Sequence, residues 1–159
     1  GRYSFVLQKY EHQREELTVF HKSRYSLIGK KSNTHLTVFH NLDSLYFKEE
    51  SIIEDYSIGN FIDSLASAPI KSVYSFKKKK MLVVDSLGVY NIKSFKPDYV
   101  LLRNSPKINL HRLLDSLKPK KIIADGSNYK SYVKQWKLTC DTRGVSFHNT
   151  RRDGAFVLK

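Results

Sequence analysis

The sequence predicts one α/β domain in which layers of mixed β-sheet are combined with a few helices. Its 159 residues suit a single domain, and a hydrophobic fraction of 40% with 13% aromatic residues is enough to build a core. That composition excludes a disordered or low-complexity chain. The hydrophobic spacing switches between a period of 2 and a period of 3.6, and strands alternate with helices in the last third, which is typical of an α/β layer.

The first half begins with three strand-like stretches. They lie near residues 17–20, 25–28 and 36–39, and the turn-rich residues 29–33 separate the second from the third. This pattern predicts a β-meander. Residues 45–53 are less regular.

The middle of the chain predicts a short helix followed by a hairpin. Ile53, Tyr56, Phe61, Ile62 and Leu65 approximate helical spacing, so we expect a helix that ends before Pro69, although Gly59 interrupts the run. Strands are then expected at residues 73–76 and 81–84, with the lysines of residues 77–80 at the hairpin tip.

The last third predicts strands at residues 99–102 and 122–124, and further short strands at 145–147 and 155–158. Helices are expected near residues 110–117 and 129–142, the second after Ser127 and Asn128, which are good N-cap residues. On the second helix, Val133, Trp136 and Cys140 share one side, which we expect to pack on the sheet. An adjacent side carries Lys130, Lys134 and Lys137.

The net charge of +13 is concentrated in the second half. Residues 1–80 carry 13 basic and 9 acidic side chains, whereas residues 81–159 carry 15 and 6. Such a field attracts nucleic acid or the headgroups of an anionic bilayer, but a solvated surface helix is an equally ordinary explanation of lysines on one face.

Several function classes have no support in the sequence. Apolar runs do not exceed four residues, far short of the roughly 20 that a membrane-spanning helix needs. Cys140 is the one cysteine and is expected to be buried and structural, so neither an internal disulfide nor a thiolate zinc site is expected. Recognised histidine-metal spacings, phosphate-binding loops and nucleophile elbows are absent as well.

Two loops are candidate anion-binding sites. The first contains Gly126, Ser127 and Asn128, between a strand and a helix start, where backbone N–H groups can receive an anion. Its simpler interpretation is a capped turn in which Asp125 accepts backbone hydrogen bonds. The second is residues 151–154, which read as a tight turn between two strands whose arginines can face a phosphate.

The second half also resembles a known family, the C-terminal metallo-β-lactamase-like domain of ComEC, the inner-membrane channel of natural transformation. The segments that carry the resemblance are residues 97–106, 113–119, 121–128, 136–137, 140, 147–150 and 154–156, and those from residue 125 onward look especially like Bacteroidetes members. Residues 16–20, 26–28 and 36–39 resemble the opening strands. The resemblance covers residues 17–158 and implies a metallo-β-lactamase-like fold attached to a membrane region before Gly1.

The sequence departs from that family where active members hold zinc. The H-x-H-x-D-H signature is missing, Phe39-His40-Asn41 stands near the first strands, and Arg103-Asn104-Ser105-Pro106 replaces H-H-G-S. Arginine and asparagine cannot hold a zinc-bound hydroxide. We therefore expect a degenerate, noncatalytic member without metal or other cofactor.

Three functions remain open. The first is a scaffold or sequence-independent DNA-handling role in DNA uptake, beside the transmembrane part of the parent protein. Its candidate contacts are Lys77, Lys78, Lys79, Lys80, Lys130, Lys134, Lys137, Arg151 and Arg152. The second is an assembly module that contacts the anionic membrane surface. The third is a phosphodiesterase with a different metal site, built from Asp125, His148 and Asp153.

Overall fold

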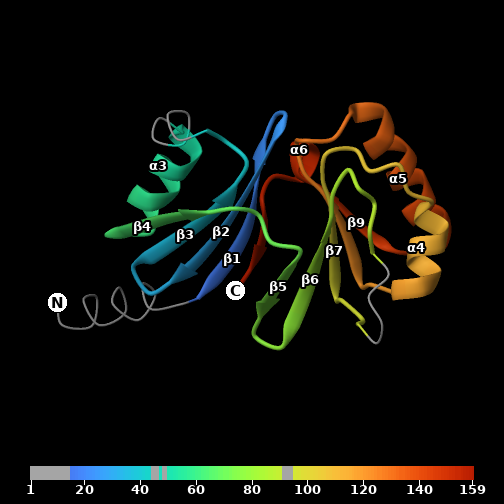
Figure 1. The fold of residues 1–159 in the computed structure, drawn as a ribbon, viewed down its shortest axis with the longest axis horizontal. Helices are drawn as coiled ribbons and strands as arrows, with labels where there is room; N and C mark the ends of the chain where they lie inside the picture. Colours follow the sequence, from blue (N-terminus) through green and yellow to red (C-terminus); the bar gives the residue numbers. More distant parts are fainter. Residues whose placement is uncertain (1–14, 44–46, 48–49, 91–94) are drawn as a thin grey trace.

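Two five-stranded mixed sheets pack face to face and carry helices on their outer sides (Figure 1). This arrangement is taken from a computed structural model, which describes residues 15–43, 47, 50–90 and 95–159. It confirms the predicted α/β class and is consistent with a metallo-β-lactamase-like fold.

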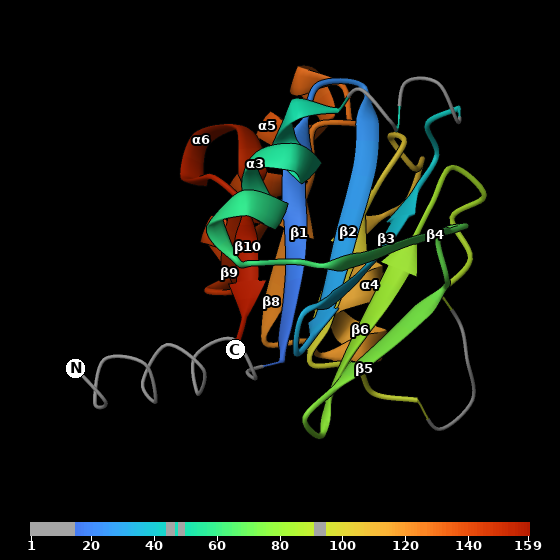
Figure 2. The same ribbon diagram turned by 90° about the vertical axis from the view of Figure 1, so that its left-hand side faces the viewer.

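The first sheet combines the start of the chain with its last strand. Its strands are β1 (Glu16–Lys22), β2 (Tyr25–Ser32), β3 (His35–His40), β4 (Ser64–Ala68) and β10 (Phe156–Leu158), in the order β10-β1-β2-β3-β4. The β3–β4 pair is parallel and the other pairs are antiparallel. Helix α3 (Ser51–Gly59) lies over the outer face of this sheet (Figure 2).

The second sheet has the order β5-β6-β7-β8-β9. Its strands are β5 (Val73–Phe76), β6 (Lys79–Val84), β7 (Tyr99–Leu102), β8 (Lys121–Ala124) and β9 (Ser146–Asn149). Helices α4 (Leu110–Leu117) and α5 (Lys130–Arg143) connect β7 to β8 and β8 to β9, and the short helix α6 (Thr150–Asp153) precedes β10. Strands β6 to β9 are parallel, so their carboxyl ends meet at one edge of the sheet.

Each layer boundary is filled by one apolar cluster, because alternate residues of a strand point to opposite faces. Met81 and Val83 face the first sheet, whereas Leu82 and Val84 face α4 and α5. Phe20, on the outer face of the first sheet, contacts α3 through Tyr56, with ring centroids 5.2 Å apart. The order of layers is therefore helix, sheet, sheet, helix.

The predicted β-meander is confirmed, but the predicted connection at residues 29–33 is wrong. Strand β2 continues to Ser32, and only Asn33 and Thr34 form the turn. Gly29 lies inside this strand, and a Cβ there would stand 2.8 Å from the Phe20 ring. The glycine therefore marks a close contact with an aromatic side chain and not a turn.

The predicted helix up to Pro69 is also wrong in its second part. Helix α3 ends at Gly59, Phe61 adopts a left-handed φ of 56°, and Leu65 lies in β4. The start of α3 is fixed by Glu50, which accepts a hydrogen bond from the Ile52 N–H and pairs with Lys22 at 2.6 Å. The predicted irregular stretch includes residues 45, 46, 48 and 49, which lie outside the described residues.

The remaining predicted elements are close to those observed. Helix α4 and strand β7 have the predicted bounds, and α5, β8, β9 and β10 shift by one or two residues at their ends. The hairpin tip is shorter than predicted, because only Lys77 and Lys78 form the turn and Lys79 and Lys80 belong to β6. Across the described ranges, no helix is both long and apolar enough to cross a bilayer.

Candidate functional site

A cavity lies where three connections meet at the carboxyl edge of the second sheet. The connections are the tip of the β1–β2 hairpin, the loop after β7, and the loop between β8 and α5. The cavity has a volume of about 650 Å³. Its lining consists of Ser23, Arg24, Asn104, Ser105, Gly126, Ser127, Asn128, Tyr129, Lys130 and Arg151.

The loop before α5 is held by its own side chains. Buried Asn128 donates from Nδ2 to the Leu102 carbonyl at 2.7 Å and accepts the Ser105 N–H at 2.7 Å. Ser127 accepts the Asn104 N–H at 2.9 Å and donates to Asp125. The expectation that Ser127 or Asn128 caps α5 is therefore wrong, because both side chains are used to join the two loops.

The residue at the helix start is Tyr129, which makes no side-chain capping bond. Its N–H donates to Ser105 Oγ at 2.8 Å. The N–H of Ser127 donates to Asp125 Oδ1 at 3.1 Å, as the capped-turn interpretation predicts. Two of the backbone donors expected to receive an anion are thus bound within the protein, and the charge of this site comes from its side chains.

The loop after β7 holds an unfavourable backbone conformation. Asn104 and Ser105 both lie in the left-handed region, with φ of 58° and 50°. Such residues cost about 1–3 kcal/mol each and persist only where the surroundings enforce them. Here Ser127 and Asn128 bind the N–H groups of both residues, which fixes this wall of the cavity.

Gly126 brings the hairpin tip against the loop. A Cβ on Gly126 would stand 2.3 Å from the carbonyl oxygen of Lys22, so only glycine fits. The Arg24 N–H donates to the Gly126 carbonyl at 2.8 Å. This contact joins the first sheet to the second and places Arg24 at the rim of the cavity.

A buried polar cluster lies between the sheets beside this contact. Arg103, 8% exposed, donates from Nε to Ser26 Oγ at 3.1 Å, and the Ser26 N–H donates to Asn41 Oδ1 at 3.1 Å. Burial raises the pKa of Asp125, although Ser127, Ser26 and the charge of Arg103 act in the opposite direction. Arg103, at the position that the resemblance compares with the H-H-G-S motif, and Asn41 are thus hydrogen-bonded to the same residue, Ser26.

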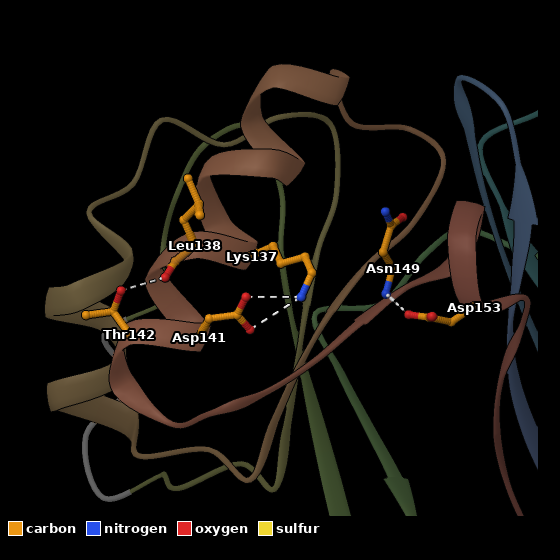
Figure 3. Close-up of polar contacts among 6 residues, drawn as sticks. All are labelled: Lys137, Leu138, Asp141, Thr142, Asn149 and Asp153. Carbon is orange, nitrogen blue, oxygen red and sulfur yellow. Dashed lines mark hydrogen bonds and ion pairs between the residues drawn. The ribbon is translucent and has the colours of Figure 1, made fainter.

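Cationic side chains surround the cavity. Arg24, Lys130 and Arg151 are exposed and line it, and no acidic residue is among its lining in the described part of the chain. A second hollow of about 220 Å³ shares Lys130 and Arg151 with the first and adds Lys134 and Lys137. Lys137 is neutralised by Asp141 at 3.1 Å (Figure 3).

The structure separates the candidate contacts into two groups. Lys130, Lys134, Lys137 and Arg151 lie together, whereas Arg152 does not line either hollow. Lys79 and Lys80 start β6, at the edge of the sheet opposite the cavity, together with the turn of Lys77 and Lys78. Lys120 and Lys121 at the start of β8 lie at that same edge.

The residues of the third hypothesis make separate contacts. The imidazole Nε2 of His148 lies 2.8 Å from the Gly154 carbonyl, and Asp153 accepts the Asn149 N–H at 3.0 Å (Figure 3). Among the described residues, no group of three or more histidine, cysteine, aspartate or glutamate side chains could hold a metal ion. Cys140 is buried, as predicted, and burial raises the pKa of its thiol to about 11.

Five residues of the cavity lining were not among the site residues predicted from the sequence: Ser23, Arg24, Asn104, Ser105 and Tyr129. Arg24 sits in a two-residue turn distant in sequence from the rest, which carries no signal of its own. The signal that could have found Tyr129 is its place in the sequence, as an aromatic residue directly before a lysine-bearing helix. In the structure its side chain is 71% exposed.

Comparison with known proteins gives one family. The profile of the ComEC C-terminal domain matches residues 17–159, which includes both sheets and the cavity. No curated protein and no solved structure matches the chain. The chain therefore belongs to the ComEC C-terminal domain family.

Proposed function

We propose that this ComEC C-terminal domain is noncatalytic and binds DNA during DNA uptake without reading its sequence. The observation that carries the proposal is the cationic surface of Arg24, Lys130, Lys134 and Arg151 around the cavity. Lysine and arginine bind phosphates of any sequence, and they release counterions when they do so. Family membership supports DNA uptake as the setting.

The noncatalytic part of the proposal rests on the buried cluster. Arg103 brings a permanent positive charge to the place where the family resemblance expects a metal ligand, and it is hydrogen-bonded to Ser26. A guanidinium has no lone pair to offer a metal ion and would repel it. The expected result is purified protein with no stoichiometric zinc or manganese and no metal-dependent cleavage of single- or double-stranded DNA; either activity or bound metal would overturn it.

The DNA-binding part is tested by fluorescence anisotropy of labelled DNA over a salt series. The variant Lys130→Glu/Lys134→Glu/Arg151→Glu reverses three exposed charges and omits Lys137, whose charge Asp141 already neutralises. Loss of about three phosphate contacts from a single strand should reduce the slope of log affinity against log salt by about 2. Far-UV circular dichroism shows whether the variant stays folded.

A matched control reverses three charges at the opposite edge, as Lys77→Glu/Lys78→Glu/Lys80→Glu. It changes the net charge equally, so a general loss of attraction would weaken both variants alike. We expect the control to keep most of the salt-dependent binding. If the control loses binding and the first variant keeps it, the hairpin and not the cavity is the DNA-contact surface.

A second candidate function is attachment to the anionic membrane surface, which the lysines of the opposite edge favour. Lys80, Asp98 and Lys120 lie in register across β6 to β8, because the Asp98 N–H donates to Lys80 and the Lys120 N–H donates to Asp98. Asp98 is the acidic residue between them. Binding of the domain to vesicles that contain phosphatidylglycerol, lost in the hairpin variant and kept in the cavity variant, would support this function.

A further inference from the structure

The cavity contains one exposed aromatic ring among its cations. Tyr129 is 71% exposed and stands between the loop after β8 and Lys130, the first residue of α5. Exposed tyrosines are ordinary on protein surfaces, but this ring lies in the lining of a concave site with three cationic side chains.

The backbone of Tyr129 is fixed while its ring is open to solvent. Its N–H is bound by Ser105 Oγ at 2.8 Å, and the adjoining Asn128 is buried and hydrogen-bonded to both loops. Because the backbone is already fixed, a ligand that binds here has to order only the side chain, which reduces the total entropy lost on binding.

The ring is supported from the side of the core. Its centroid lies 5.9 Å from that of half-buried Tyr132, which in turn makes an edge contact with buried Trp136 at 6.0 Å. Three aromatic side chains thus run from the core to the surface, and the outermost keeps most of its area exposed.

From this arrangement we propose that the cavity takes an unpaired DNA strand, with one base stacked on Tyr129 and the adjacent phosphates against Lys130 and Arg151. Stacking on an aromatic ring requires an open base face, which a base within a duplex does not offer. The volume of about 650 Å³ lies within the range of ligand pockets, and the second hollow continues from it along Lys134. The inference rests on the proposed DNA binding. It adds the contact, a base stacked on Tyr129, that would favour an unpaired strand over a duplex.

The test compares three labelled ligands of equal phosphate number: a single strand, the same strand with abasic sites throughout, and a blunt duplex with half as many base pairs. Tyr129→Ala should lower the affinity for the single strand by about tenfold, within the usual range for loss of one stacked base. Affinities for the abasic strand and the duplex should stay unchanged. Tyr129→Trp should restore binding of the single strand.

Phe61→Ala is the matched control, because Phe61 is 59% exposed and lies beyond α3, away from the cavity. It should leave all three affinities unchanged. An equal loss for all three ligands on Tyr129→Ala, or no loss for any, would overturn the stacking inference.

The failure of the inference is distinguishable from that of the proposed function. If the triple charge reversal at Lys130, Lys134 and Arg151 weakens binding of the single strand while Tyr129→Ala does not, DNA binding stands and the stacked base is refuted. If the wild-type domain binds none of the three ligands at low salt, both proposals are refuted.

Discussion

A substitution at Gly126 tests directly whether its contact with the β1–β2 hairpin joins the two sheets. In the variant Gly126→Ala, the new methyl group would stand 2.3 Å from the Lys22 carbonyl oxygen, 2.8 Å from its carbon and 2.9 Å from His21 Cε1. Two of these three atoms belong to the backbone, so no rotation of a side chain relieves the contact. The backbone φ of Gly126 lies outside the left-handed region, and alanine therefore adds no conformational strain.

The expected cost follows from two contributions. Separation of the loops loses the hydrogen bond from the Arg24 N–H to the Gly126 carbonyl, worth about 1 kcal/mol. Overpacking of a buried site costs about 1–3 kcal/mol more. The free energy of unfolding should thus fall by about 2–4 kcal/mol, which for a domain of this size lowers Tm by about 5–15 °C.

Denaturant unfolding followed by circular dichroism measures this change, and Gly59→Ala is its control. Gly59 ends α3 with no atom near enough to contact a new methyl group, so alanine there should be neutral or stabilise by up to about 1 kcal/mol. If the free energy of unfolding of Gly126→Ala is within about 0.5 kcal/mol of the wild-type value, the two loops are not held together as described, and the rigidity assigned to the cavity is refuted.

Three further outcomes are expected. Burial raises the pKa of Asp125 in the folded state, so ionisation of its carboxyl group destabilises the fold. This loss of stability appears as the pH rises from the ordinary carboxyl pKa of about 4 to the higher pKa of the folded state. The stability of Asp125→Asn relative to wild type should therefore increase with pH over that window in urea titrations, and a decrease would contradict the assignment. Asn128→Ala removes three hydrogen bonds of a buried side chain and should lower the free energy of unfolding by about 2–4 kcal/mol, with a change below about 1 kcal/mol as the contrary result. Cys140 is fully buried and the pKa of its thiol is raised, so iodoacetamide should modify it only after the protein unfolds. Mass spectrometry detects the modification, and rapid modification of the native protein would show that α5 is not packed as described.

The regular elements were largely predictable because their burial follows a simple period. Leu110, Leu113, Leu114 and Leu117 are all buried on one side of α4, and the sequence prediction has the same bounds as the helix. The strands around Val19, Ile28 and Phe39 were predicted for the same reason, since hydrophobic side chains cluster in each of them.

Strand β4 was not predicted because its side chains lack the hydrophobic alternation that indicates a strand. It is an edge strand paired only with β3, and Leu65 in it is 49% exposed. A strand that buries little has a weak hydrophobic pattern, and its serine and alanine residues are no stronger a signal for a strand than for a loop. Its pairing with β3 is a tertiary contact that local spacing cannot indicate.

The candidate site was predictable only where it coincides with a helix. Lys130 and Lys134 are one turn apart on α5 and were predicted together, and Arg151 was included on charge alone. Arg24 reaches the same cavity from a hairpin more than a hundred residues away, so its place depends on how the sheets pack. The two hydrogen-bonded loops likewise replace the helix cap that Ser127 and Asn128 suggested.

The pairing of β10 with β1 also orders events during synthesis. Leu17 lies opposite Leu158, so the first sheet is completed only after the rest of the domain has been synthesised. Until then β1 presents an unpaired edge, and the inner layer lacks Phe156 and Leu158, which are buried in it. Closing a loop that spans almost the whole domain makes such pairing slow, so the edge of β1 stays open to pairing with other strands until residues 156–158 have been synthesised.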